Sequence, residues 1–556
     1  MEDNAENHID KLPQELLLMT MEYLEVEELK ESSAVCNSWR ELIGSCAKTM
    51  KHLPLVISYR SDLLDDLCIK RTFNKIELNG IDLDRVDNLL IVLEKHGKEV
   101  RHLIIRRLSI YSDLFRNILR SMPQLRKISL DEIHFNCHEE VNETVEMKEL
   151  THVVLNECHP AILSYFDTYK VTSLKQSNYS FSLYHKQLPA LQELYIRRKS
   201  GVVETETVSC ADTLDKTQLK RLSIGFDGDN LIMQLLEQVK ETLEELEFIE
   251  TYKCSWEIYE FIFKNFKKLK QLELNIDRIP TSTRNQLRVL PNVKTLILHS
   301  NHYLHDGIQP FIGSLPNIET LVLDCEANDE NTNRLMTFIS VNLQNLRVLE
   351  IKQVNNETFK DVSFANLREL LINETNIKDD GLKSITQSCA TIEKLCIESP
   401  YDFALNHEDR VCVIADDLKK LQHIYLGTGF IATKMILLYI WNSLPELKTF
   451  TIMEDAVKDD PLLPAEFLNG PRLIVAKKRV NFSKAVDVYD REDVQFTSYD
   501  LEGDDFGGDD FGGDFDAVDD IDDSDSSFVG YDDIQDWEPI ESEDSDDYWG
   551  GYARPV

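Results

Sequence analysis

Histidine and cysteine side chains are the residues in this sequence whose spacing could support metal or nucleophilic chemistry. His299, His302 and His305 lie within seven residues, directly after an apolar run that predicts a strand. Imidazole nitrogens bind Zn²⁺ when several of them converge on one point. Because nothing in this pattern fixes the geometry of the ligands, we interpret the three histidines as a polar loop at a sheet edge. We expect no metal and no cofactor.

The sequence lacks the common catalytic motifs. The sequence has no P-loop, no G-x-G-x-x-G that opens a helix, no H-E-x-x-H and no G-x-S-x-G. Cys158 and His159 are adjacent, but a buried thiol beside a turn histidine explains them better than a catalytic pair. We therefore expect a protein that is not an enzyme and has no catalytic residues.

The number of cysteines and the hydropathy of the sequence indicate the cellular compartment of the protein. The eleven cysteines form no C-x-x-C pair, and an odd number argues against a secreted disulfide framework. No uncharged stretch approaches the roughly 18 residues that a membrane span needs. We expect free thiols, no membrane partner, and a cytoplasmic or nuclear location.

Charge is distributed unevenly along the 556 residues. The formal net charge is −39, and residues 487–556 contribute 26 acidic against 2 basic residues. Such acidity disfavours binding to a phosphate backbone, so we expect no nucleic-acid partner. Glycine-rich acidic runs such as 503–513 cannot form a core, and we predict a disordered tail over 487–556. Its twelve aromatic residues suggest a segment that binds a basic, partly apolar surface, although a purely solubilising tail remains an alternative.

A repeated apolar frame dominates the middle of the chain. An apolar residue, two variable ones, an apolar residue, a variable one and an apolar residue recur, as in Leu269–Leu274 and Leu346–Ile351. Sixteen unit starts can be assigned from residue 73 to residue 447, on average about 25 residues apart. Five units share a proline two places ahead of the first apolar residue: Pro123, Pro189, Pro291, Pro316 and Pro445. The unit at 171 is degenerate, because Gln176 stands where the third apolar residue belongs.

Each unit predicts a short strand, a turn and often an amphipathic helix. One such unit cannot bury its apolar face alone, but stacked units share a continuous core and align their strands in a curved parallel sheet. We therefore predict an α/β solenoid over residues 53–486 with about 16 repeats, which resembles a leucine-rich repeat array. The preceding segments are a flexible N-terminus at 1–9 and a separate helical module at 10–52.

The variable residues inside the frame should project from the concave face of the sheet, where solenoids usually bind partners. We expect substrate contacts there, although an ordinary solvated face would show the same pattern. The candidates are Arg101, His102, Arg106, Lys127, Tyr195, Arg221, Glu247, Glu273, Glu350 and Tyr425.

The helical module at 10–52 carries more apolar residues than three short helices can bury between themselves. Docking to another protein would bury the apolar surface that remains exposed. The residues concerned are Leu12, Pro13, Leu16, Leu17, Leu24, Leu29, Val35, Cys36 and Trp39.

In order and spacing these residues resemble an F-box, with Thr20 and Ser32 at positions that are usually apolar. An F-box followed by leucine-rich repeats resembles the F-box/leucine-rich-repeat family of ubiquitin-ligase substrate receptors. The resemblance implies that the nine residues dock a Skp-type adaptor, which links the chain to a cullin-RING scaffold, and that the repeats hold a protein substrate whose identity is unknown.

A second hypothesis comes from the acidic tail. The chain would then be a ligase-independent binding protein, similar to acidic-tailed leucine-rich-repeat proteins that chaperone basic partners such as histones. In that case the tail would capture the basic partner, and the N-terminal helices would cap the solenoid.

Overall fold

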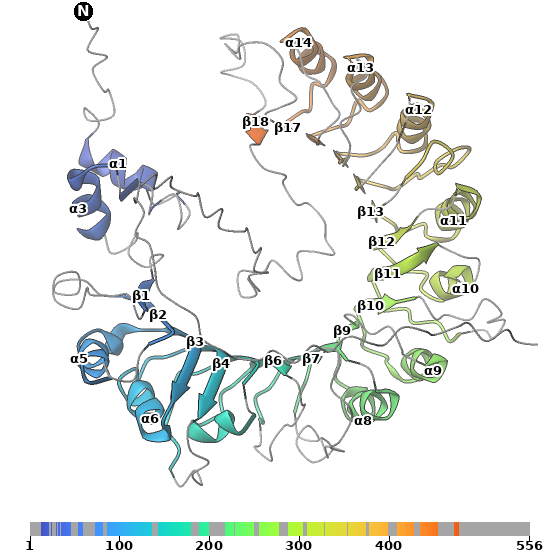
Figure 1. Ribbon diagram of the computed structural model, residues 1–556. Helices are drawn as coiled ribbons and strands as arrows, with labels where there is room; N and C mark the ends of the chain where they lie inside the picture. Colours follow the sequence, from blue (N-terminus) through green and yellow to red (C-terminus); the bar gives the residue numbers. More distant parts are fainter. Residues whose placement is uncertain are drawn as a thin grey trace, which may run out of the picture. The chain divides into compact units, whose positions relative to one another are not determined.

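The computed structural model describes residues 13–476 with interruptions (Figure 1). Residues 1–12 and 477–556 lie outside the described part. The larger internal gaps are at 46–53, 59–72, 136–142, 179–187, 199–216, 277–286, 399–407 and 454–471, with several shorter ones. Within the described part, no helix combines the length and the apolar character that crossing a bilayer needs.

Eighteen parallel strands form one sheet in the described part of the chain. Each strand pairs with the strands before and after it in chain order. The strands are β1 (Leu55–Ser58), β2 (Lys75–Asn79), β3 (His102–Ile110), β4 (Lys127–Phe135), β5 (His152–Asn156), β6 (Ser173–Asn178), β7 (Glu193–Arg198), β8 (Arg221–Gly225), β9 (Glu245–Phe248), β10 (Gln271–Asn275), β11 (Thr295–Tyr303), β12 (Thr320–Glu326), β13 (Val348–Ile351), β14 (Glu369–Ile372), β15 (Lys394–Ile397), β16 (His423–Leu426), β17 (Thr449–Met453) and β18 (Arg472–Ala476).

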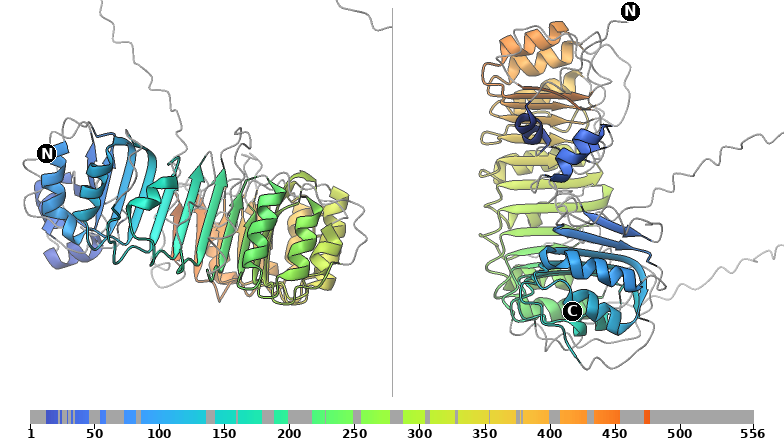
Figure 2. Two further views of the ribbon diagram at one scale, coloured as in Figure 1. Left: turned by 90° about the horizontal axis from the view of Figure 1, so that it is seen from below. Right: turned by 90° about the vertical axis from the view of Figure 1, so that its left-hand side faces the viewer.

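Helices follow many of the strands and pack on one face of the sheet, which curves so that its other face is concave (Figure 1). Two further views show the strands side by side along the array (Figure 2). In the array the helices are α5 (Val86–His96), α6 (Ser112–Arg120), α8 (Asp229–Val239), α9 (Trp256–Asn265), α10 (Ile308–Gly313), α11 (Asp329–Asn342), α12 (Asp379–Ser388), α13 (Glu408–Asp417) and α14 (Lys434–Ser443), with 3₁₀ turns η3 (Gly97–Glu99) and η4 (Pro160–Tyr165). The N-terminal module contains α1 (Gln14–Met21) and α3 (Asn37–Ser45).

The apolar frame accounts for this architecture strand by strand. Each of the sixteen predicted unit starts precedes a strand by two residues, from residue 73 before β2 to residue 447 before β17. The second and third apolar residues of each frame alternate with outward residues, so they face the helices. One hydrophobic core runs through the array from Ile57 to Phe450. The predicted curved α/β repeat array is confirmed.

The degenerate unit at residue 171 also forms a strand. Gln176 lies in register between Leu155 of β5 and Ile196 of β7, and it is buried with them. Neither its side-chain oxygen nor its side-chain nitrogen has a hydrogen-bond partner. The neighbouring strands therefore impose the fold on a residue whose polarity opposes it.

The chain divides into two units, residues 1–494 and residues 495–556. The second unit lies wholly outside the described residues. The predicted disorder of the tail from residue 487 and the predicted domain boundaries stay predictions.

Candidate functional site: the N-terminal module and the concave face

The N-terminal module has a small core of its own. Met21, Leu29, Leu42 and Ile43 are buried together, and Leu17, Leu18, Leu24 and Trp39 pack partly against them. The backbone amides of Leu16 and Leu17 both donate to the carbonyl oxygen of Pro13, which starts α1. Proline fits here because the first helical turn needs no amide donor from it.

The predicted docking residues divide into buried and exposed members. Leu29 is fully buried inside the module, whereas 47% of Leu16 and 66% of Val35 are exposed. Met19, which the sequence analysis did not single out, is 55% exposed. Leu17, Leu24, Cys36 and Trp39 are half-buried, Pro13 is exposed, and Leu12 lies outside the described residues. The exposed apolar residues are therefore the ones that are free to contact another protein.

The concave face carries one residue from the middle of each strand. In β8 to β12 these residues are in register, and we call them, with their counterparts in the other strands, the central row. Neighbouring members stand about 4.8 Å apart, so their side chains contact one another across the strands. The central row of β7 to β16 consists of Tyr195, Ser223, Glu247, Glu273, Ile297, Val322, Glu350, Leu371, Cys396 and Tyr425.

Several of the predicted concave-face residues are buried, which differs from the ordinary solvated face that the sequence left as an alternative. Glu247 and Glu273 are fully buried, and Arg221, Glu350 and Tyr425 are at most 5% exposed. The physical reason is that side chains on adjacent strands cover and pair with one another. Their role as substrate contacts stays a prediction. Arg101 is exposed, while His102, Arg106, Lys127 and Tyr195 are half-buried.

Basic residues occupy the first positions of strands β2 to β4 on this face. His102 lies in register between Lys75 and Lys127, and its Nε2 is 3.5 Å from the Ser129 hydroxyl. Burial, together with the charges of Lys127 and Lys75, lowers the pKa of His102 to about 3. His102 is therefore neutral at physiological pH, while Lys75 forms an ion pair with Glu77 at 3.0 Å.

Arg221 organises a buried ion cluster at the centre of the face. Its guanidinium forms ion pairs with Glu247 and, at 3.4 Å, with Glu245. It also lies 5.3 Å from the centre of the Tyr195 ring, which Lys175 approaches from β6 at 4.7 Å. Burial raises the pKa of Glu247 to about 7, although Arg221 opposes the shift. The second carboxylate oxygens of Glu247 and Glu273 have no hydrogen-bond partner.

His299 forms the second part of this cluster. Its Nε2 lies 3.0 Å from Glu273 of β10, and its Nδ1 lies 3.0 Å from Asp324 of β12. Lys352 pairs with the other oxygen of Asp324 at 3.0 Å. Burial alone would lower the pKa of His299, but the two carboxylates outweigh it and raise the pKa to about 9. The imidazole is therefore a cation at neutral pH and donates from both nitrogens.

This arrangement explains the first histidine of the 299–305 group. A protonated imidazole held between two carboxylates has no free lone pair for a metal. Among the described residues, no group of three or more His, Cys, Asp or Glu side chains is placed to hold a metal ion. The side chains of His302 and His305 lie outside the described residues.

The central row itself becomes apolar from β11 onward, where His299 and Asp324 of the ion cluster also lie. Ile297 and Val322 pack together, and a second cluster joins Val348, Leu371, Cys396 and Tyr425. Glu350 separates the two clusters in the central row. The central row thus changes from charged to mainly apolar residues along the array.

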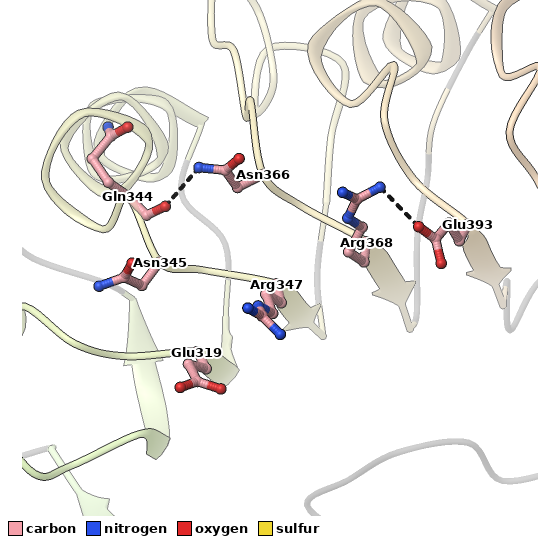
Figure 3. Close-up of a pocket in the computed structure, with 7 residues that line it drawn as sticks. All are labelled: Glu319, Gln344, Asn345, Arg347, Asn366, Arg368 and Glu393. Carbon is pink, nitrogen blue, oxygen red and sulfur yellow. Dashed lines mark hydrogen bonds and ion pairs between the residues drawn. The ribbon is translucent and has the colours of Figure 1, made fainter.

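Sequence reasoning missed a hollow at one edge of the sheet. It has a volume of about 580 Å³ and lies where β12 to β15 begin (Figure 3). The lining residues are Glu319, Gln344, Asn345, Arg347, Asn366, Arg368 and Glu393. We call it the edge pocket.

The edge pocket belongs to a second row that could have been found from the sequence. The residue directly before each strand, from β9 to β17, donates its backbone amide to the carbonyl oxygen of its counterpart one unit earlier. We call this series the edge row: Glu244, Lys270, Lys294, Glu319, Arg347, Arg368, Glu393, Gln422 and Lys448. Once the unit starts are known, its charges can be read as one column of the aligned repeats.

Comparison with known proteins yields one match to a family. The sequence model of the F-box-like domain matches residues 9–51. No curated protein sequence matches the chain. Among solved structures, a crystal structure of the Rad7 and Elc1 complex in yeast is similar, with 14% identity and a TM-score of 0.31; the match covers 71% of this chain and 89% of that chain.

The match at 9–51 spans the exposed apolar residues described above, and the repeat array follows it. The chain thus carries an F-box-like domain followed by a curved array of parallel strand repeats.

Proposed function

We propose that this chain is the substrate-recognition subunit of a Skp–cullin–F-box ubiquitin ligase. The observation that carries the proposal is the F-box-like domain at 9–51, whose small core leaves Leu16, Met19 and Val35 exposed. Apolar side chains gathered on a small module are typical of a docking surface. A Skp-type adaptor would cover them and connect the chain to a cullin-RING scaffold.

In this proposal the chain works without a catalytic residue. The array holds a protein substrate while the scaffold brings a ubiquitin-loaded enzyme close to it. Holding two reactants together accelerates their reaction, because the entropy of their encounter is lost on binding rather than at the chemical step. Such a receptor would act in the cytoplasm or the nucleus.

The test is capture of a purified Skp-type adaptor by the full-length chain. Leu16→Asp combined with Val35→Asp should reduce capture at least tenfold, because both changes place a charge in an apolar contact. Both positions are exposed, so thermal unfolding of the array should not change. Ile91→Asp is a matched control, since Ile91 of α5 is 63% exposed and lies outside the F-box-like domain. Equal capture by all three proteins would contradict the docking assignment.

The acidity of residues 487–556 favours a second candidate, a ligase-independent protein that binds basic partners such as histones. Deletion of this segment separates the two candidates. The ligase proposal expects adaptor capture to survive the deletion. Loss of histone binding on deletion, combined with normal behaviour of the Leu16→Asp and Val35→Asp variant, would favour the second candidate.

A further inference from the structure

The carboxylates of the edge pocket are already neutralised by neighbours in the edge row. Glu319 accepts a hydrogen bond from Lys294 at 2.7 Å, and Glu393 accepts one from Arg368 at 2.8 Å. The hydrogen bond from Lys294 also lowers the pKa of Glu319 below its usual range. Neither carboxylate is therefore left to attract a cation into the pocket.

Arg347 also lines the pocket, but it takes part in neither of these two ion pairs. Within the described residues its guanidinium has no hydrogen bond and no ion pair, although Glu319 and Arg368 lie on either side of it (Figure 3). Elsewhere in the edge row, opposite or complementary groups pair between neighbouring units, as in Lys270 with Glu244 and Lys448 with Gln422. Arg347 and Arg368 place two like charges on adjacent strands, as Lys270 and Lys294 also do. Both of those lysines and Arg368 have an ion-pair partner, whereas the carboxylate nearest to Arg347, that of Glu319, is hydrogen-bonded to Lys294.

Amide side chains fix the wall of the pocket. Asn366 donates to the carbonyl oxygen of Gln344 at 2.8 Å, and Asn345 donates to the side-chain oxygen of Asn317 at 3.3 Å. The Gln344 amide donates back to the carbonyl oxygens of Ser340 and Val341 in α11. A wall held in this way loses little entropy when a ligand binds. The Arg347 guanidinium retains all five of its N–H donors for that ligand.

We propose that the edge pocket binds an oxyanion, a carboxylate or a phosphate group, presented by a segment of a partner protein. Arg347 would bind the two oxygens side by side, the geometry in which a guanidinium binds such groups most strongly. Arg368 would add charge while it stays paired with Glu393. The proposal deepens the proposed function, because it states the kind of group that a substrate offers to the array.

The experiment measures peptide binding to the full-length chain by fluorescence polarisation. Three labelled peptides share one neutral glycine–serine sequence and carry phosphoserine, glutamate or serine at the central position. We expect the two anionic peptides to bind and the serine peptide to bind at least tenfold more weakly. Tighter binding of the phosphoserine peptide identifies a phosphate site, and equal binding of both anionic peptides identifies a carboxylate site.

Variants assign the binding to Arg347. Arg347→Gln should weaken binding of the anionic peptide about tenfold or more, because hydrogen bonds between charged groups are lost. Lys383→Gln in α12 removes the same charge from an exposed helical position and should leave binding unchanged. Glu319→Gln should strengthen binding, since it removes a negative charge from the wall.

The proposal is overturned if no anionic peptide binds the intact chain, or if Arg347→Gln and Lys383→Gln have the same effect. Because the assay contains no adaptor, its failure does not affect the ligase assignment. Loss of adaptor capture in the F-box variant likewise leaves this test untouched.

Discussion

Two sets of charged side chains run across the strands of the array, and they differ in burial. The ion cluster on the concave face joins Arg221, Glu247, Glu273, His299 and Asp324, and its two glutamates are fully buried. The edge row contains comparable ion pairs, such as Lys270 with Glu244 at 2.5 Å, but its lysines are more than half exposed. Similar short contacts therefore occur in two different environments.

The difference teaches that contact geometry alone does not give the energy of an ion pair. A buried pair costs desolvation, so the penalty appears when one partner is removed and the other is left uncompensated. An exposed pair exchanges one solvated state for another, and its net contribution is about 0–1 kcal/mol. The concave cluster should therefore govern stability, while the edge row should be free to serve binding.

The largest effect is expected from Arg221→Met. The change keeps the length of the side chain but leaves Glu247 buried without its cation, so that Glu247 must take up a proton to stay buried. At pH 9, two units above its pKa of about 7, this should reduce the free energy of unfolding by about 3 kcal/mol. Chemical denaturation of the full-length chain, followed by circular dichroism, measures this loss. The effect should be smaller below pH 7, because Glu247, with its raised pKa, is then largely neutral.

The matched control is the double variant Arg221→Met with Glu247→Leu. Removing both charges should restore most of the lost stability, since apolar replacements of a buried pair are often neutral or stabilising. If the double variant is as unstable as the single one, the loss comes from packing of the arginine and not from an uncompensated charge.

Replacing a buried polar group that has no hydrogen-bond partner should increase stability, in contrast to Arg221→Met. Gln176→Leu should raise the free energy of unfolding by about 1–3 kcal/mol, because the unpaired amide of Gln176 no longer has to be desolvated. The flanking residues in register, Leu155 and Ile196, already provide apolar neighbours. Thermal unfolding measures the gain. A lower melting temperature would indicate that the amide has a role that apolar packing cannot replace.

The pH dependence of stability separates two members of the concave cluster. The pKa of Glu247 rises from 4.5 to about 7 on folding, and that of His299 rises from 6.5 to about 9. A group whose folded pKa is raised stabilises the fold below its unfolded pKa and loses that contribution as pH rises through the folded pKa. Stability should therefore fall between pH 4.5 and 7 because of Glu247, and between pH 6.5 and 9 because of His299.

His299→Gln tests the upper range. The variant should lose the decline between pH 7 and 9, which we expect to be on the order of 2 kcal/mol in the wild-type chain. It should keep the decline between pH 4.5 and 6.5, since Glu247 is unchanged. Denaturation midpoints of both chains, measured between pH 4.5 and 9, test this expectation. A wild-type chain that does not lose stability above pH 7 would contradict a protonated His299.

Much of the array could be predicted from the sequence because its strands obey a local rule. The Leu269–Leu274 frame gives β10, and even the unit containing Gln176 gives β6. The terminal strands β1 and β18 were missed. Register aligns Leu55 and Leu473 with the second apolar residue of the neighbouring frames, and the sequence has His or Gly, not an apolar residue, three positions earlier. Pairing with an adjacent strand supplies what their own sequence lacks.

The candidate sites were less predictable, because they depend on contacts between units. The frame places Glu273 and His299 on the concave face, but it does not indicate that they bind each other or that Glu273 is buried. Arg347 looks like any surface arginine until the neighbouring units show that Lys294 and Arg368 have taken the nearby carboxylates. Burial and pairing follow from register between units, which a single unit does not contain.

The smallest effect is expected in the edge row, where Lys270→Gln breaks the ion pair with Glu244. The two side chains are 61% and 32% exposed, so solvent and salt screen their attraction. The free energy of unfolding should fall by less than about 1 kcal/mol, and the change should vanish in 1 M salt. Arg221→Met, measured in the same salt, should keep most of its effect because its partner is shielded from solvent. If Lys270→Gln destabilised the chain as much as Arg221→Met does, the edge row would also be essential for the stability of the array. Its ion pairs could then be replaced by contacts with a ligand only at a large cost in stability.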